Sequence, residues 1–238
     1  MELVLVRHGQ TAANRSGALD TGRPGSPLDV KGLAQAQALA RRWESEVAAL
    51  PRVVAVSPLR RTRQTVAPLL ERCGVVPLVR RGIREIRSGD VEMDAWTTSI
   101  ARYMGTLDRW AHGDVAVRME GAESGSEVLA RVLPVVAEVV TAVQEDAGED
   151  GVGALVVHGA LLRFLAPTLS YDLDPTMVMA HRPGNTSTTV LVAPPGLVPD
   201  RSGEDLVGAF TARTWNDRPV GEWGVPVDGA PDLVNAED

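Results

Sequence analysis

The sequence has little cysteine, little lysine and no long apolar run. Cys73 is the only cysteine among 238 residues, so no disulfide bond can form within the chain, which agrees with a reducing compartment. No stretch reaches the roughly 18 apolar residues that a membrane-spanning helix needs, and no basic and then apolar leader precedes the first apolar segment. These absences predict a cytoplasmic protein that does not span a membrane.

The net charge of −7 is unevenly distributed along the chain. Residues 195–238 hold nine acidic residues and three arginines, a net charge of −6, which leaves −1 for residues 1–194. A near-neutral body with an acidic end argues against nucleic acid or an anionic membrane as the main partner. Lys31 is the only lysine among 24 basic residues, so only position distinguishes one arginine as functional.

The segment 2–7 gives the first strong structural signal. It is rich in Val and Leu, which is typical of a strand buried on both faces, and it runs into the turn Arg7-His8-Gly9. In open α/β sheets, ligands bind beyond the carboxyl ends of the strands, so this turn places a cation and an imidazole at such a site. Gly9 permits close approach of the backbone to a ligand, and Asn14 would add an amide donor.

A second buried strand is predicted at 53–57, followed by a helix that begins after Pro58. The first turn of this helix carries Arg60, Arg61 and Arg63. A helix N-terminus at a strand end favours an anion, so one of these arginines would face a ligand. The residues alone do not distinguish Arg60 from Arg61, and solvation on a polar helix face is the alternative for each.

The segment 153–157 repeats the pattern of the first strand, because it also ends in a His-Gly pair, His158-Gly159. A single histidine of this kind is more often a capped core residue. Two strands that end in His-Gly favour a shared site at one edge of a sheet. Glu85 lies on a loop between these strands, where a weak ion pair with Arg84 or Arg87 is the alternative to a role in the site.

These segments resemble, in order, the motifs of the histidine phosphatase superfamily, also called the phosphoglycerate-mutase-like family. The resemblance covers roughly residues 3–193. Around the proton donor it is incomplete, since Val91 replaces the usual Trp and Met93 the last Gly. The matching residues form five groups: Arg7-His8-Gly9-Gln10-Thr11 with Asn14; Ser57, Leu59 and Arg61; Glu85 with Gly89; Gly121-Ala122-Glu123-Ser124; and His158-Gly159 with Arg163.

The resemblance implies a role for each site residue. His8 would attack phosphorus to form a phosphohistidine, and Glu85 would protonate the departing oxygen. Arg7, Arg61 and His158 would stabilise the phosphoryl oxygens. No cofactor and no metal ion are implied, and the sequence shows no cluster of ligands at the spacing of a metal site. The substrate would contact residues of the same motifs: Arg7, Asn14, Arg61, His158 and Gly159.

The implied fold is a three-layer α/β sandwich with a mostly parallel central sheet, helices on both faces and a small helical cap over the carboxyl ends of the strands. One domain would span residues 1–218, with the cap at 94–120. Residues 219–238, acidic and rich in Gly and Pro, are predicted to be an extended or mobile tail.

Local signals refine this expectation. Asp29 is predicted to cap a helix that runs to about Leu50, with Leu33 on its apolar face. A short strand is predicted near Val75 to Val79. The segment 15–28 predicts a loop bordering the site, and Ala209 to Trp215 predicts an edge strand.

The sequence favours a metal-independent phosphomonoester hydrolase that acts on a small phosphorylated metabolite. The mutase branch usually has Glu-Arg-His-Tyr-Gly around its proton donor, whereas this chain has Glu85-Ile86-Arg87-Ser88-Gly89. A cofactor-dependent phosphoglycerate mutase is therefore the second hypothesis. A non-catalytic module that binds phospho-ligands is the third, because binding alone needs neither a nucleophile nor a proton donor. The sequence does not indicate the substrate or the oligomeric state, and a homodimer remains open.

Overall fold

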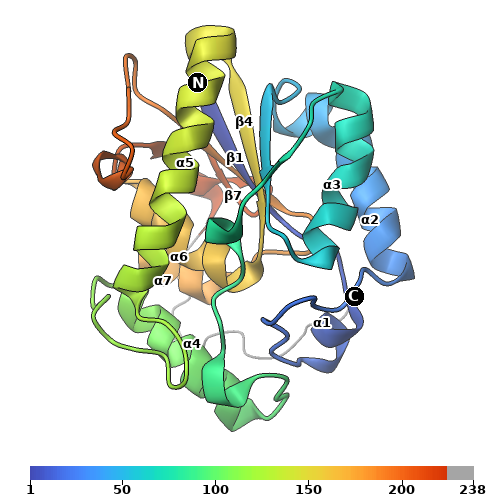
Figure 1. Ribbon diagram of the computed structural model, residues 1–238, viewed down its shortest axis with the longest axis vertical. Helices are drawn as coiled ribbons and strands as arrows, with labels where there is room; N and C mark the ends of the chain where they lie inside the picture. The colour runs from blue at the N-terminus through green and yellow to red at the C-terminus, as the bar shows by residue number, and fades with distance from the viewer. Residues whose placement is uncertain (224–238) are drawn as a thin grey trace.

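The computed structural model describes residues 1–223 and shows an α/β fold in three layers (Figure 1). The central layer is a six-stranded sheet with the order β3-β2-β4-β1-β5-β6. The β1, β2, β3 and β4 pairings are parallel, and β5 and β6 add antiparallel pairs at one edge. The predicted mostly parallel sheet is confirmed. Its strands are β1 (Glu2–Arg7), β2 (Val53–Val56), β3 (Leu78–Val79), β4 (Val152–Val157), β5 (Thr188–Val192) and β6 (Thr211–Ala212).

Helices cover both faces of the sheet, as the sequence predicted (Figure 1). The helices α2 and α3 pack on one face, and α5 and α6 pack on the other, while α1 and α4 lie beyond the carboxyl ends of the parallel strands. The helices are α1 (Ala12–Ser16), α2 (Val30–Arg42), α3 (Arg60–Cys73), α4 (Thr97–Ala111), α5 (Gly125–Ala147), α6 (Gly159–Leu169) and α7 (Pro175–Ala180).

Strand β1 shows why the sheet is buried on both faces. Leu3 and Leu5 belong to the apolar core under α5 and α6, whereas Val4 and Val6 belong to the core under α2 and α3. This alternation follows from the two-residue period of a strand. All four side chains are fully buried, so the turn after Arg7 is fixed by packing on both sides.

The helix that Asp29 caps is shorter than predicted. The Asp29 side chain accepts a hydrogen bond from the Gly32 amide, but the α-helical geometry ends at Arg42, and a π-helical turn (Trp43–Val47) follows. Trp43, the first residue of this turn, is fully buried. The predicted apolar role of Leu33 is wrong, since its side chain is 47% exposed. The buried stripe of α2 instead runs through Gly32, Ala36, Leu39 and Ala40, and Leu33 lies beside it.

The two short strands predicted near Val75 to Val79 and at Ala209 to Trp215 also differ from the sequence prediction. Strand β3 is limited to Leu78–Val79, and the predicted edge strand is divided into β6 and β7 (Thr214–Trp215). Strand β7 forms a hairpin with β8 (Arg218–Pro219). A 3-10 turn follows, and the Trp223 indole donates a hydrogen bond to the carbonyl of Trp215. The ordered fold thus continues to Trp223, and residues 224–238 of the predicted tail lie outside the described residues.

The structure contains no candidate for a transmembrane helix within residues 1–223. The longest helix, α5, has a polar face and packs its apolar face on the sheet. Its N-cap is Ser124, which forms a capping box with Glu127, and its C-cap is Gly148.

Candidate active site

Four of the five predicted motifs meet in one cavity of about 250 Å³ at the carboxyl ends of β1, β2 and β4. The cap helix α4 forms the opposite wall, through Tyr103 and Met104 among others. His158 is fully buried beneath the cavity and does not line it. The other six predicted site residues line the cavity directly: Arg7, His8, Asn14, Arg61, Glu85 and Gly159.

The imidazole of His8 has a defined tautomer. Its Nδ1 lies 2.7 Å from the carbonyl oxygen of Gly9, so Nδ1 carries the proton and donates. Its Nε2 therefore holds a lone pair, and it accepts a hydrogen bond from Nε of Arg61 at 3.1 Å. Burial, and then the charges of Arg61 and Arg7, hold the pKa of His8 well below its usual value. The ring is neutral at pH 7, with Nε2 available as a nucleophile.

His158 faces the same guanidinium from the other side. Its Nδ1 accepts from Nε of Arg61 at 3.3 Å, and its Nε2 lies 2.7 Å from Oγ of Ser57. Since Arg61 is a donor, Nδ1 is unprotonated and Nε2 donates to Ser57. Burial, followed by the Arg61 charge, lowers the pKa of His158 well below its usual value. The centres of the His8 and His158 rings are 5.3 Å apart.

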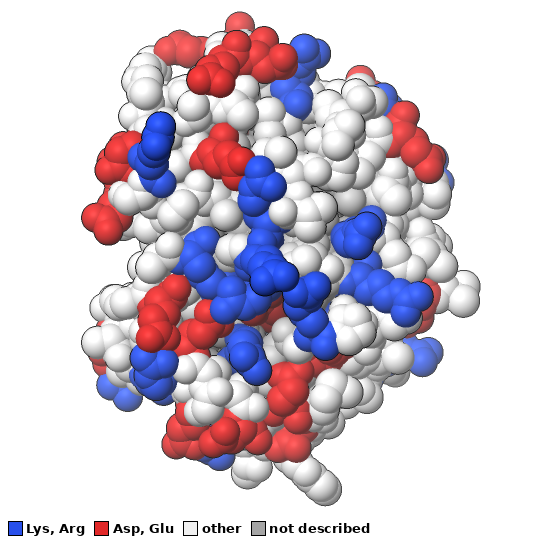
Figure 2. Space-filling model, viewed as in Figure 1, with Lys and Arg blue, Asp and Glu red and all other residues white. Residues whose placement is uncertain are grey.

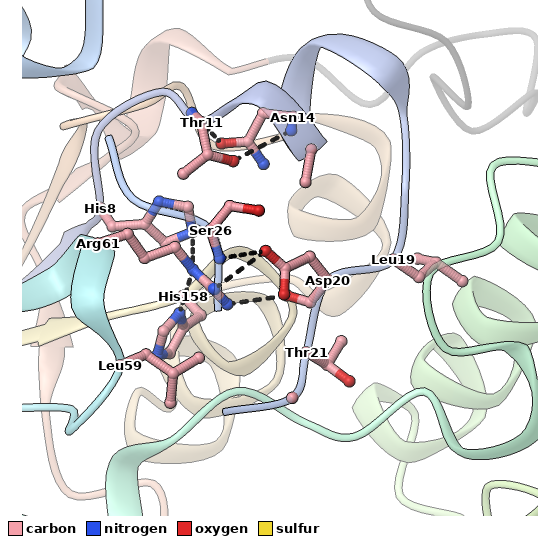
Figure 3. A network of polar contacts seen from close by, with 12 residues as sticks. His8, Thr11, Asn14, Leu19, Asp20, Thr21, Ser26, Leu59, Arg61 and His158 are labelled. Atoms are coloured by element: carbon pink, nitrogen blue, oxygen red, sulfur yellow. Dashed lines mark hydrogen bonds and ion pairs between the residues drawn. The ribbon is translucent and has the colours of Figure 1, made fainter. Parts of the chain in front are cut away.

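Arg61 is the arginine of α3 that enters the site, and Arg60 and Arg63 are exposed. This distinction follows from helix geometry, since the three point in different directions from the first turn. The NH2 group of Arg61 donates to the main-chain oxygen of Asp20 at 2.9 Å, and NH1 lies 3.6 Å from the Asp20 carboxylate (Figure 3). NH1 is buried and donates no hydrogen bond within the described residues.

Arg7 holds a second buried guanidinium group in the cavity. Its NH1 donates to the carbonyl of Pro183, while its Nε makes no hydrogen bond within residues 1–223. A side chain at position 159 would place its Cβ 3.2 Å from that Nε, so Gly159 leaves the approach to the donor open. Burial, and then the charges of Arg182 and Arg163, lower the pKa of Arg7 well below its usual value. Positive charge is thus concentrated here, which favours an anion.

Glu85 caps α6 from a separate loop. Its Oε1 accepts from the amides of Ile86 and Leu161, both at 2.9 Å, and its Oε2 accepts from the amide of Ala160 at 3.2 Å. Burial raises the pKa of Glu85, although these hydrogen bonds and Arg61 act in the opposite direction. The ion pair with Arg84 or Arg87, the alternative prediction, is wrong, because Arg84 pairs with Glu123.

Glu123 and Arg131 support the Glu85 loop from below. The guanidinium of Arg131 pairs with Glu123 and donates to the main-chain oxygens of Gly82, Arg84 and Glu85. Ser124 and Glu127 cap the N-terminus of α5. Glu123 instead contributes through Arg131.

Asn14 and Asn185 connect the first turn to β5. Oδ1 of Asn14 accepts from the amide of Thr11 at 3.1 Å and from Nδ2 of Asn185 at 3.2 Å. This pairing leaves the Asn14 amide group as a donor that faces the cavity. Nδ2 of Asn185 also donates to the main-chain oxygen of His8 at 3.0 Å, so Asn185 helps to hold the turn that carries His8.

Three charged residues of the cavity received no site role from the sequence: Asp20, Arg163 and Arg182. Arg163 carried a signal, its place after the second His-Gly pair, whereas Asp20 and Arg182 lie on irregular segments without one. Arginine side chains also gather across the middle of the face shown in Figure 2, between two groups of acidic side chains. No group of three or more His, Cys, Asp or Glu side chains within the described residues has the arrangement of a metal site.

Comparison with known proteins agrees with this arrangement. The sequence profile of the histidine phosphatase superfamily (branch 1) matches residues 3–197. A glucosyl-3-phosphoglycerate phosphatase of Mycobacterium tuberculosis (strain CDC 1551 / Oshkosh) is 34% identical over 170 residues, or 70% of this chain and 74% of that protein. A probable phosphoglycerate mutase of Enterobacter sp. (strain 638) is 29% identical over 71% of this chain and 74% of its own length.

The fold has a matching neighbour among solved structures. A mycobacterial glucosyl-3-phosphoglycerate phosphatase, solved in complex with VO3, has a TM-score of 0.64 and 30% identity, covering 80% of this chain and 92% of that one. The chain belongs to the histidine phosphatase superfamily, branch 1. Its similarity to named phosphatases supports hydrolysis of the phosphomonoester of a small phosphorylated metabolite, and supports a mutase less.

Proposed function

We propose that the chain hydrolyses phosphomonoesters through a phosphohistidine at His8, without a metal ion. The observation that carries this proposal is the lone pair of His8 Nε2 beside two buried donors, Nε of Arg7 and NH1 of Arg61, that make no hydrogen bond within the described residues. Buried donors without partners are rare in folded proteins, so they indicate a ligand that accepts. Guanidinium groups pair well with phosphate oxygens, and they supply the positive charge that a metal ion would otherwise give.

The first half of the reaction forms the covalent intermediate. Nε2 of His8 attacks phosphorus, the bond between phosphorus and the ester oxygen breaks, and protonated Glu85 gives its proton to that oxygen. The raised pKa of Glu85 supports this role, since it keeps the carboxyl protonated at higher pH than usual. Arg7 and Arg61 stabilise the charge on the remaining phosphoryl oxygens.

The second half releases phosphate. Ionised Glu85 takes a proton from a water molecule, which attacks phosphorus as the bond to Nε2 of His8 breaks. The hydrogen bond from Nδ1 to the carbonyl of Gly9 stabilises the positive charge that the His8 ring carries in the intermediate. This step restores neutral His8 and protonated Glu85, so one phosphate ester and one water give one alcohol and one phosphate.

Arg61 must change partners during this cycle. In the free protein its Nε lies between the two imidazoles, 3.1 Å from His8 Nε2 and 3.3 Å from His158 Nδ1. A bound phosphate offers stronger, charged acceptors, so the guanidinium turns to the phosphate oxygens and uncovers Nε2. The negative charge also favours protonation of His158, which then becomes a second donor to the phosphate.

The substrate we propose is a small phosphorylated metabolite of the kind named for the mycobacterial relatives, glucosyl-3-phosphoglycerate. A cavity of about 250 Å³ is smaller than the 300–1,000 Å³ typical of drug-sized ligands, which supports a small phosphorylated group inside it. The similarity to a probable phosphoglycerate mutase keeps that activity as the second candidate. A binding module without catalysis has less support, because it requires neither a neutral His8 nor a protonated Glu85.

The deciding experiment measures phosphate release from a panel of phosphomonoesters at pH 5 to 7.5 with EDTA present, including glucosyl-3-phosphoglycerate and 3-phosphoglycerate. Wild-type protein is compared with His8→Ala. Release by the wild type alone supports the metal-independent reaction and ranks the substrates. Loss of wild-type activity in EDTA contradicts it, and interconversion of phosphoglycerates without release supports the mutase.

A further inference from the structure

Asp20 places a carboxylate in a cavity that is otherwise suited to an anion. Its side chain is only 9% exposed, and it lines the same cavity as His8 and Arg61 (Figure 3). A negative charge beside Arg61 reduces the attraction of that guanidinium for a phosphate. A carboxylate that weakens phosphate binding in this way is expected to bind another part of the substrate.

The position of the Asp20 carboxylate is fixed on several sides. Its Oδ2 accepts from the amide of Ser26 at 2.7 Å and lies 3.6 Å from NH1 of Arg61. The two residues that follow Asp20 donate their amides to Glu92, both at 2.8 Å, and the amide of Leu19 donates to the carbonyl of Asp94 at 2.9 Å. The loop therefore holds the carboxylate in place before a substrate binds, which reduces the entropy cost of using it.

The second oxygen of this carboxylate is the one available to a ligand. Oδ1 of Asp20 accepts no hydrogen bond within residues 1–223, and it is not among the buried atoms without a partner. It is thus accessible from the cavity that Asp20 lines. An ionised carboxylate only accepts hydrogen bonds and repels other anions, so its complement is a neutral or cationic donor.

We infer that Oδ1 of Asp20 accepts a hydrogen bond from a hydroxyl group of the leaving alcohol, so that the enzyme selects phosphate esters of polyols. This inference rests on the proposed hydrolysis. The other oxygen of the same carboxylate is 3.6 Å from the guanidinium that binds phosphate, so the hydroxyl lies close to the phosphate in space, whether it is on the carbon chain or on an attached sugar. An alcohol without that hydroxyl leaves Oδ1 of the carboxylate desolvated and without a hydrogen bond, which disfavours the analogue.

The test compares glycerol 1-phosphate with propyl phosphate, which has the same carbon chain but no free hydroxyl. Phosphate release is measured for both, and p-nitrophenyl phosphate reports the basic hydrolytic activity. The wild type should favour glycerol 1-phosphate by about 10- to 100-fold in kcat/KM, since a charged acceptor is involved. Asp20→Ala should reduce this ratio to about one. Glu71→Ala, which removes an exposed carboxylate of α3 outside the cavity, should leave the ratio unchanged.

The outcomes separate this inference from the proposed function. Equal kcat/KM values for the two esters in the wild type, with p-nitrophenyl phosphate still hydrolysed, overturn the role of Asp20 alone. An unchanged preference in Asp20→Ala overturns it as well. No release from any of the three esters contradicts the proposed hydrolysis itself. Because the wild-type ratio needs no variant, the inference is testable even where Asp20→Ala fails to fold.

Discussion

Nε of Arg61 donates a hydrogen bond to Nε2 of His8, at a distance of 3.1 Å. The residue that would bind phosphate therefore covers the nucleophile in the free protein. The same N–H group is 3.3 Å from Nδ1 of His158, so one donor fixes the tautomers of both imidazoles. An incoming phosphate competes with the two imidazoles for the N–H group of Arg61. Phosphate binding therefore also exposes the nucleophile.

Replacement of His8 should abolish turnover. His8→Ala removes the nucleophile, and loss of a group that forms the covalent intermediate costs about 10⁴-fold or more in kcat. His112→Ala is the matched control, because His112 is exposed at the C-cap of α4, outside the cavity. Phosphate release is measured for both variants. A rate near that of the wild type in His8→Ala would mean that another group attacks phosphorus.

Glu85 should control the alkaline side of the pH profile. Burial raises the pKa of Glu85 and lowers that of His8, and the reaction needs Glu85 protonated and His8 neutral. Activity should thus fall as pH rises through the pKa of Glu85 and as pH falls through that of His8, with a mildly acidic optimum. The measurement is kcat/KM for an alkyl phosphate from pH 4 to 9. An optimum above pH 8 would contradict these protonation states.

The leaving group provides an independent test of Glu85. Glu85→Gln should lower the rate for glycerol 1-phosphate by about 10²- to 10⁴-fold, since an alkoxide needs a proton to depart. The loss for p-nitrophenyl phosphate should be much smaller, because nitrophenolate leaves without one. Both rates are measured in the same preparation. Equal losses for the two esters would assign Glu85 a structural role only.

Much of this site followed from the sequence, because its residues lie directly at the ends of buried strands. Val-rich segments before His8 and His158 specify strands, and parallel strands bring their ends together. The choice of Arg61 over Arg60 depended on the resemblance to a family, since one helical turn carries both. Asp20 and Arg131 were not predictable, because their roles come from contacts across the fold, with Arg61 and with the loop of Glu85.

Ser57 should orient His158. Its Oγ lies 2.7 Å from Nε2 of His158 and accepts from the amide of Leu59 at 3.4 Å, so one hydroxyl serves both groups. Ser57→Ala should lower kcat/KM by roughly 10-fold, the effect of one lost hydrogen bond in a buried site. Nitrogen NMR of the imidazoles should show His158 leaving its Nε2-protonated tautomer. Ser57→Thr keeps the hydroxyl and should restore activity, whereas a single unchanged tautomer in Ser57→Ala would contradict this role.

Asn216 should position Arg7 from a distance. Its Oδ1 accepts from the amide of Gly184 at 2.7 Å, and its Nδ2 donates to the carbonyl of Arg182 at 3.3 Å. Between these two residues lies Pro183, whose carbonyl accepts from Arg7. Asn216→Ala should therefore raise the inhibition constant of vanadate, a phosphate analogue, by roughly 5- to 10-fold. The control is Gln37→Ala, which removes an exposed side-chain amide of α2 outside the cavity. Unchanged inhibition in Asn216→Ala would exclude this link.

Gly89, which lies four residues after Glu85, should be essential for stability. Its φ is +61°, and an added Cβ would lie 1.7 Å from the main-chain oxygen of Glu120. Gly89→Ala should lower the free energy of unfolding by about 3 kcal/mol, from steric overlap and backbone strain together. Gly105→Ala is the opposite case, since nothing lies within 4 Å of its added Cβ in the interior of α4, and it should stabilise by about 0.5–1 kcal/mol. Urea unfolding measures both changes. A Gly89→Ala protein as stable as the wild type would contradict both the steric overlap with Glu120 and the path of the loop that follows Glu85.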